Sequence, residues 1–388
     1  MSLTGALAGT RVLDFTRVLA GPLCTMLLAD LGAEVLKIER PGAGDDTRAW
    51  GPPFAGSESA YFLCLNRGKH SLELDLSGAA GRARARELAL QADVVVENFR
   101  AGWMAAQGLG GDALRSEHPG LIYCSVTGYG QDGPDRDLPG YDFLAQGRAG
   151  LMSITGEADG PPLKVGVAVS DLTSGLFAAV GILAALQKRT LTGEGSSVDV
   201  ALLDCQVAGL LNVASNALVS GRVPGRYGNA HPNIVPYQVF EAADGPIILA
   251  VGNDAQWRRC CPLLGHPEWA DDPRFATNPA RVAARETLAP RIAAVLRTRP
   301  VAEWLAAFAA AHVPAGPIQD IGAVFQDPQV LARGMVQEVA HPAAGLLRLI
   351  ANPLLRHATT GRPPLLGEGG EDLAAQWCAS PRSDGERR

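Results

Sequence analysis

Apolar and polar positions in the first 205 residues follow two alternating periods. Short apolar runs, typical of strands that are buried on both faces, occur at 11–15, 34–39, 71–76, 94–99, 121–126 and 198–203. Helical patterns lie between or after these runs, at 20–31, 78–91, 142–152, 176–186 and about 204–219. Short apolar strands separated by helices predict an α/β fold with a parallel sheet covered by helices on both faces.

The pattern changes after residue 219. Residues 220–233 are rich in Gly, Pro and Asn and are typical of a linker or loop. Residues 236–252 predict two strands around a turn at Asp244-Gly245. Helical patterns follow at 254–264, 281–297 and 301–311, then a Pro/Gly segment at 313–318 and a last strand at 346–350. These elements predict a second, smaller α+β domain.

Length and composition narrow the class of protein. A chain of 388 residues suggests two domains, and 47% hydrophobic with 19% charged residues is typical of a soluble globular protein. The net charge of −6 and the lack of basic blocks argue against nucleic acid as a partner. No segment reaches the apolar length of a transmembrane helix and the start lacks signal-peptide features, so we expect a cytoplasmic protein without a membrane partner. Seven scattered cysteines and seven isolated histidines predict neither disulfides nor a metal site.

One carboxylate stands out, at Asp171 in the segment 165–175. It follows an apolar run, is surrounded by small residues and glycines, and precedes an apolar helical pattern. Asp at such a junction can be an N-cap, because its side chain accepts hydrogen bonds from the first helical turn. It can also be a nucleophile, because carboxylates form covalent intermediates in dry sites. The local pattern alone leaves both interpretations open.

Basic and polar residues follow several of the predicted strands. Arg40 and Arg48 come after the second strand, where ligands bind in open α/β sheets, and a guanidinium there can bind phosphate. The alternative is that Arg40 pairs locally with Asp45 or Asp46. Residues 66–70 and 98–100 add further positive charge near the next strands.

Several ordered blocks together resemble the class III CoA-transferases, the family of formyl-CoA and carnitine CoA-transferases. The matching blocks are residues 13–22, 32–48, 65–76, 94–102, 125–130, 140–142, 169–175, 228–240 and 244–254. The resemblance runs from about Gly9 to Leu366. It implies CoA transfer from an acyl-CoA donor to a carboxylic acid, with no cofactor beyond CoA itself, no metal and no ATP.

The resemblance also implies roles for particular residues. Asp171 corresponds to the catalytic aspartate. Residues that fall where the family binds CoA are Val18, Leu19, Ala20, Arg40, Asn66, Lys69, His70, Ser71, Asn98, Phe99 and Arg100. The implied fold is a large Rossmann-like domain from both chain ends (1–205 and 330–388), a small domain (225–325) and linkers at 206–224 and 326–329. Two such chains would form an interlocked homodimer.

The same superfamily contains α-methylacyl-CoA racemases, which carry a histidine base in a GHD motif. Tyr141 occupies that position here, and tyrosine is a poor base near neutral pH, which favours transfer. A non-catalytic CoA-binding homologue is the other alternative.

Two departures separate the chain from the formyl/oxalyl branch. Leu19 replaces a glutamine, and no segment reproduces that branch's glycine-rich loop convincingly. Residues 42–54, 123–131, 233–240 and 363–368 instead resemble succinyl-CoA:glutarate-type transferases, which implies succinyl-CoA as donor and a dicarboxylate such as glutarate as acceptor. Tyr141, Asn229 and His231 are candidate substrate contacts, although the loop 228–233 could equally be structural.

Overall fold

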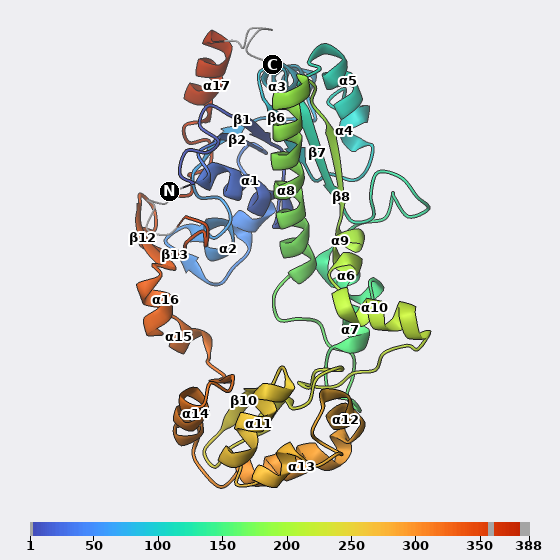
Figure 1. The fold of residues 1–388 in the computed structure, drawn as a ribbon. Coiled ribbons are helices and arrows are strands. Elements are labelled where there is room, and N and C mark those ends of the chain that lie inside the picture. The colour runs from blue at the N-terminus through green and yellow to red at the C-terminus, as the bar shows by residue number, and fades with distance from the viewer. Residues whose placement is uncertain (1–2, 356–360, 381–388) are drawn as a thin grey trace. The chain divides into compact units, whose positions relative to one another are not determined.

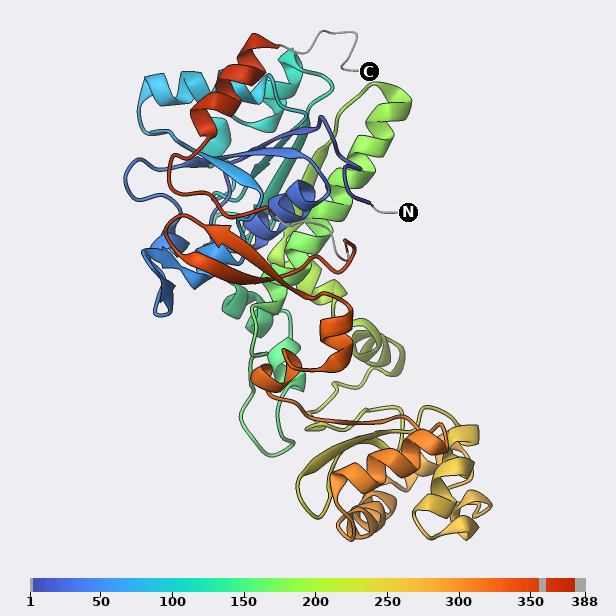
Figure 2. The same ribbon diagram turned by 90° about the vertical axis from the view of Figure 1, so that its left-hand side faces the viewer.

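The computed structural model describes residues 3–355 and 361–380 (Figures 1 and 2). The chain divides into two compact units. The first comprises Met1–Leu151, Val165–Leu211 and Asp327–Arg388, and the second comprises Met152–Lys164 and Asn212–Gln326. The sequence-based division left 152–164 in the large domain and 206–224 in a linker. In the structure, Arg226 donates to the carbonyls of Glu157 and Gly160, and these bonds tie 152–164 to the second unit.

A six-stranded parallel sheet forms the centre of the first unit. Its strands are β1 (Arg11–Asp14), β2 (Glu34–Glu39), β5 (Lys69–Glu73), β6 (Val94–Glu97), β7 (Ile122–Thr127) and β8 (Ser197–Ala201). They pair in the order β5-β2-β1-β6-β7-β8, which is the 3-2-1-4-5-6 order of the Rossmann fold. The order reverses between β1 and β6. Ligands of such sheets bind beyond the carboxyl ends of the strands at this reversal point.

Alternating residues of the strands pack against helices on both faces. Val94 and Val96 pack with α1 (Ala20–Asp30) and α8 (Val169–Thr192) in one core. Val95 points to the other face and packs with α3 (Ala79–Ala89) and α5 (Gly111–Glu117). This two-faced burial confirms the predicted α/β class.

The C-terminal part of the chain completes the first unit. Helix α17 (Gly370–Ala379) lies beside α3 (Figure 1), and its Trp377 is fully buried and donates to Glu34 of β2. The hairpin of β12 (Val336–His341) and β13 (Gly345–Ile350) is joined to the N-terminal half by Arg67, which donates to the Ile350 carbonyl. Smaller elements in this unit are η1 (Asp46–Ala49), β3 (Phe54–Ala55), β4 (Glu58–Ser59), α2 (Ala60–Leu63), α4 (Trp103–Ala106), α6 (Asp142–Arg148), α9 (Leu202–Ala208) and α16 (Pro328–Ala332).

The second unit has a small antiparallel sheet in the order β11-β10-β9. The strands β9 (Tyr237–Glu241) and β10 (Pro246–Ala250) form the predicted hairpin, and β11 (Ala315–Pro317) joins them. Helices α11 (Asp254–Leu263), α13 (Arg285–Leu296) and α14 (Val301–Ala310) surround a core that contains Trp257 and Trp304. Its other elements are η2 (Pro267–Ala270), α12 (Asn278–Ala283) and α15 (Ile321–Val324), while α7 (Leu151–Ile154) and α10 (Leu211–Ser220) begin where the first unit ends.

Several elements differ from the sequence-based prediction. The apolar run before Asp171 is not a strand, and the helix predicted for 176–186 begins earlier, at Val169, and includes Asp171. The helix predicted for 204–219 is broken into α9 and α10, with Leu211 at φ +46°. Strand β12 has an irregular burial pattern and was not predicted.

By length and composition, α8 could cross a membrane, contrary to the sequence-based expectation, and so could the bent pair α9–α10 taken together. Helix α8, however, packs one face on α1 and the sheet, as the core helix of a soluble protein does.

Candidate active site

Asp171 lies in the first turn of α8, but it is not the N-cap. The N-cap residue is Ala168, which has no side chain able to cap. The backbone N–H groups of Ser170 and Asp171 instead donate to Oδ1 of Asp142, at 2.8 and 3.4 Å. Within 3–355 and 361–380, the Asp171 carboxylate accepts no hydrogen bond. The capping task therefore belongs to Asp142 of α6, and the side chain of Asp171 is available for chemistry.

The environment of Asp171 disfavours its charge. Burial, and then the negative charge of Asp142, raise the pKa of Asp171 from 3.8 to about 7. Among the described residues, no cation offsets these two effects on the pKa, so the carboxylate is poorly solvated when it ionises. Unpaired carboxylates with raised pKa values are typical of functional sites.

Asp171 lines a cavity of about 350 Å³ that also contains the start of α1. Gly175, one turn further along α8, allows this approach: a Cβ at Gly175 would lie only 2.7 Å from the Ala20 carbonyl oxygen. Asp171 and Gly175 share a helix face because they are four residues apart. The close packing therefore sets Asp171 beside Leu19 and Ala20, at the N-terminus of α1.

Aromatic and basic side chains form much of the remaining wall of this cavity. Trp50 and Tyr141 are 44% and 63% exposed there. Three guanidinium groups, those of Arg17, Arg100 and Arg136, line the same cavity. A site with several cations and one nucleophilic carboxylate can bind an anionic substrate and still attack it.

A second cavity, of about 200 Å³, adjoins the first through Arg17 and Phe99. Its walls include Leu74, Leu76 and Trp103, whose indole stacks on Phe99 at 4.3 Å between ring centroids. It lies at the carboxyl ends of β1, β2, β5 and β6. An apolar slot with cations at its edge suits a nucleotide base and its phosphates.

Arg40 and Arg48 have different positions, although both were candidates for the same role. Arg40 pairs with Asp46, as the alternative interpretation expected, and it also lines the second cavity, so that its binding of phosphate stays a prediction. Arg48 is partly buried, with its side chain 10% exposed, donates to Glu39 at 2.8 Å and to Glu58 at 3.3 Å, and lies over the Phe62 ring. Arg48 therefore has a structural environment.

Three other predicted CoA contacts lie in a buried polar network. Lys69 donates to Asp14, Asn66 and the Pro22 carbonyl. Ser71 donates to Glu39 and accepts from the Gly367 N–H. Among the described residues, Asn66, Lys69 and Ser71 line neither cavity, and His70 is exposed beside Gly369. The polar atoms of Asn66, Lys69 and Ser71 therefore stabilise the edge of the sheet at β5.

The remaining predicted residues divide between the two units. Val18, Leu19, Ala20, Asn98, Phe99, Arg100 and Tyr141 line the cavity of Asp171. Asn229 and His231 belong to the second unit, where Nδ1 of His231 accepts from the Asn233 N–H and its ring packs on Tyr237. Sequence reasoning missed Arg17, Trp50, Trp103 and Arg136. Of these, Arg17 had a usable signal, since it directly follows the first predicted strand.

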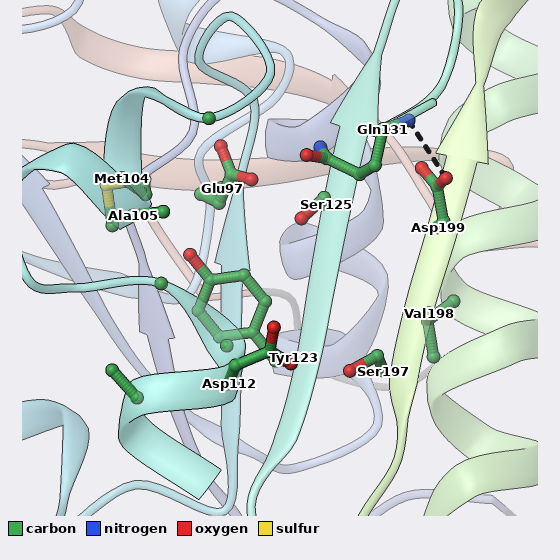
Figure 3. Close-up of a pocket in the computed structure, with 14 residues that line it drawn as sticks. Glu97, Met104, Ala105, Asp112, Tyr123, Ser125, Gln131, Ser197, Val198 and Asp199 are labelled. Carbon is green, nitrogen blue, oxygen red and sulfur yellow. Dashed lines mark hydrogen bonds between the residues drawn. The ribbon is translucent and has the colours of Figure 1, made fainter. Parts of the chain in front are cut away.

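A third cavity, of about 440 Å³, contains no predicted site residue (Figure 3). It lies over β6, β7 and β8, on the sheet face opposite α8, and Glu97, Ser125 and Asp199 point into it. Burial raises the pKa of Glu97 to about 7 despite hydrogen bonds from Ser125 and the Phe99 N–H. No group of three or more His, Cys, Asp or Glu in the described ranges could hold a metal ion.

A Rossmann-type sheet with an unpaired carboxylate beside a nucleotide-shaped slot is consistent with acyl-CoA chemistry. Residues 7–369 match CoA-transferase family III, so the chain belongs to that family and is an enzyme that transfers CoA.

Its relatives are similar over most of their length. The succinate–glutarate CoA-transferase of Agrobacterium fabrum is 47% identical over 380 residues, 95% of each chain. The succinyl-CoA:glutarate CoA-transferase of Mus musculus is 45% identical over 93% of this chain and 84% of its own. A crystal structure of a CAIB/BAIF family protein from Brucella suis superposes with a TM-score of 0.82 at 43% identity, covering 96% of this chain and 99% of that chain.

The raised pKa of Asp171 predicts a pH-dependent gain of stability in Asp171→Asn. Between pH 3.8 and about 7 the folded protein retains a proton that the unfolded chain has released, so this group lowers the free energy of unfolding as pH rises. The side-chain amide in Asp171→Asn does not ionise, so the variant does not lose unfolding free energy in this way. We expect Asp171→Asn to unfold at a higher temperature than the wild type at pH 8, with the difference shrinking towards pH 5.

Thermal unfolding of both proteins across this pH range provides the measurement. Asp137→Asn is the matched control, because the Asp137 side chain is 77% exposed. An Asp171→Asn difference that does not change with pH would contradict the raised pKa.

Proposed function

We propose that the protein moves CoA from succinyl-CoA to glutarate, with Asp171 as nucleophile. The observation that carries this proposal is an unpaired, half-buried carboxylate with a raised pKa at the N-terminus of α1. The relatives named for succinate, succinyl-CoA and glutarate support the substrates. The clustering of Arg17, Arg100 and Arg136 supports a dianionic acid, because each acid brings a second carboxylate that does not react.

The first half-reaction transfers CoA to the protein. An oxygen of the ionised Asp171 attacks the thioester carbonyl of succinyl-CoA, and the C–S bond breaks to give a mixed anhydride and CoA thiolate. The thiolate then attacks the Asp171 carbonyl of that anhydride. The C–O bond breaks, succinate leaves, and Asp171 carries CoA as a thioester.

The second half-reaction reverses the order with glutarate. Its carboxylate attacks the aspartyl thioester, which releases CoA thiolate and forms an aspartyl–glutaryl anhydride. The thiolate attacks the glutaryl carbonyl, giving glutaryl-CoA and the free Asp171 carboxylate. One thioester is exchanged for another, so the reaction as proposed requires neither ATP nor a metal.

The N-terminus of α1 is suited to stabilise each oxyanion. The first N–H groups of a helix have no intrahelical acceptor, and the helix dipole favours negative charge there. The N-cap Leu19 has no side-chain capping bond. We infer that the N–H groups of Leu19 and Ala20 face the developing oxyanion beside Asp171.

The two adjoining cavities suggest how CoA lies in the first unit. We place its nucleotide end in the slot of Phe99, Trp103, Leu74 and Leu76, with Arg17 and Arg40 at the phosphates. The pantetheine arm then passes Arg17 and Phe99, which both cavities share, and brings the thioester to Asp171.

An exposed apolar face supports a homodimer. On α8, Leu172, Leu176, Phe177 and Val180 are between 39% and 62% exposed, although their helix forms part of the core. Large exposed apolar patches mark interaction surfaces. We propose that a second copy of the chain covers this face in the interlocked dimer that the family resemblance implies, and that the enzyme works in the cytoplasm.

Covalent capture tests the nucleophile. Incubation with succinyl-CoA and no acceptor should add the mass of CoA, or of a succinyl anhydride, to the peptide containing Asp171, as seen by mass spectrometry. Hydroxylamine should intercept the adduct and inactivate the enzyme. Asp171→Asn should fold, bind CoA and show no transfer. Wild-type transfer rates in this variant would falsify the mechanism.

Arg40 and Arg48 should respond differently to truncation. Arg40→Ala should weaken CoA binding about tenfold, or about 1.5 kcal/mol for a hydrogen bond to a charged group, with little change in stability. Arg48→Ala leaves Glu39 buried without its main partner and should cost about 3–5 kcal/mol of unfolding free energy. Calorimetric titration with CoA and urea unfolding separate the two effects. Unchanged CoA affinity in Arg40→Ala would contradict the placement of the CoA phosphates beside Arg40.

Dilution tests the dimer. An interface that buries the apolar face of α8 should persist at nanomolar concentration in sedimentation velocity, and Val180→Glu should reduce association and activity together. A folded, active monomer would show that this face is exposed to solvent in the working enzyme.

A further inference from the structure

In the loop between β1 and α1, side chains hold five of the six backbone N–H and C=O groups of residues 16–18. The Thr16 N–H donates to Asp14 at 2.8 Å, and Lys37 donates to the Thr16 carbonyl at 2.7 Å. The Arg17 N–H donates to Oδ1 of Asn98 at 2.9 Å, and Nδ2 of Asn98 donates to the Arg17 carbonyl at 2.7 Å. Two of these partners lie outside the loop, because Lys37 belongs to β2 and Asn98 follows β6. The conformation of the loop therefore depends on tertiary contacts as well as on local turn bonds.

These bonds surround Val18, whose backbone conformation is rare for its residue type. Its φ is +72°, in the left-handed region that a β-branched residue rarely adopts. Its N–H lies 3.3 Å from both carboxylate oxygens of Asp45. A strained residue persists only where its surroundings over-determine it, and such residues cluster at functional sites. Val18 lines the cavity of Asp171, one residue before the N-cap of α1.

The anchors of the loop are themselves fixed. Lys37 and Asp45 pair at 3.0 Å, and both side chains are 0% exposed. Burial opposes ionisation of Asp45, but the charge of Lys37 and bonds from Thr47 lower its pKa to about 2, so the acceptor for Val18 stays charged. Asn98 uses both ends of its amide on Arg17, the residue before Val18.

We propose that Asn98 and Asp45 are positioning residues that hold residues 16–18 in a strained conformation and thereby direct the N-terminus of α1 at the Asp171 carboxylate. This inference rests on the proposed function, and it gives Asn98 a role different from the CoA contact that the family resemblance implies. If Asn98 holds the loop, its loss should slow the chemical steps, because the loop sets where the free N–H groups of α1 lie. If Asn98 contacts CoA, its loss should weaken CoA binding.

The two roles of Asn98 predict opposite kinetics. Asn98→Asp keeps the acceptor for the Arg17 N–H and places an oxygen against the Arg17 carbonyl in place of the donor. For a clamp we expect kcat and the rate of adduct formation on Asp171 to fall at least tenfold, with the Kd of CoA changed less than threefold. For a CoA contact, Kd and KM should rise while kcat at saturation is kept, and that result would overturn the proposal.

Relief of the strain at Val18 provides the second measurement. Glycine adopts a φ of +72° without a side-chain clash, so the loop in a Val18→Gly background depends less on its clamp. The fall in kcat caused by Asn98→Asp should therefore be at least threefold smaller in that background. Val18→Ala is the matched control, because it shortens the side chain but keeps a Cβ in the left-handed region. Rescue by neither variant, or equal rescue by both, would overturn the role of strain.

Further measurements distinguish failure of the clamp from misfolding and from failure of the proposed function. If Asn98→Asp does not fold, as judged by circular dichroism, Asn98→Ala, which removes both bonds without adding charge, replaces it in the same cycle. Wild-type enzyme is measured first for transfer and for the adduct on Asp171. No adduct in the wild type means that the proposed function fails. A normal wild-type adduct with unchanged kcat in the Asn98 variants means that only the clamp fails.

Discussion

Two buried ion pairs around the carboxyl end of β1 determine the geometry of this site. Asp14 of β1 pairs with Lys69 of β5 at 3.1 Å, and Lys37 of β2 pairs with Asp45 at 3.0 Å, with all four side chains 0% exposed. Buried charges are tolerated only when they are paired and hydrogen-bonded, so each member restricts its partner. The loops after β1 and β2 cannot move without exposing or separating these charges. They form the walls of both cavities.

Aspartates of the first unit have pKa values that are shifted in opposite directions. Asp14 and Asp45 are more deeply buried than Asp171, yet nearby lysines and hydroxyl groups overcome the effect of burial and lower their pKa values. Asp171 has no cation or hydrogen-bond donor in the described structure to offset burial, and Asp142 adds repulsion, so its pKa is raised. Pairing, and not burial alone, separates these structural carboxylates from the proposed nucleophile. An ionised Asp171 is poorly solvated, which favours attack on a carbonyl carbon.

The sequence predicted the sheet well because buried parallel strands have a strong signature, and it located Asp171 because small residues surround it. It could not separate Arg40 from Arg48, since the seven residues between them, a turn that leads into η1, decide which guanidinium turns to Glu39 and which to the cavity. Asn66, Lys69 and Ser71 follow the family's CoA-binding blocks, but their side chains point into a polar network that only the three-dimensional pairing of β5 reveals. The N-cap and nucleophile interpretations of Asp171 were likewise separable only after Asp142, 29 residues away, was seen to cap the helix.

Helix α8 would link the proposed catalysis to the proposed dimer, because its two faces have side chains of different sizes. The face that meets α1 contains Ser174, Gly175, Ala178 and Ala179, all buried, and these small residues let the two helices approach closely enough to bring Asp171 to Ala20. The opposite face carries Leu176, Phe177 and Val180, which are exposed in the single chain. A helix with large residues on both faces would keep α1 away from the nucleophile, whereas one with small residues on both would offer little apolar area for association. The sequence pattern that places the carboxylate thus also leaves the surface that a second copy would cover.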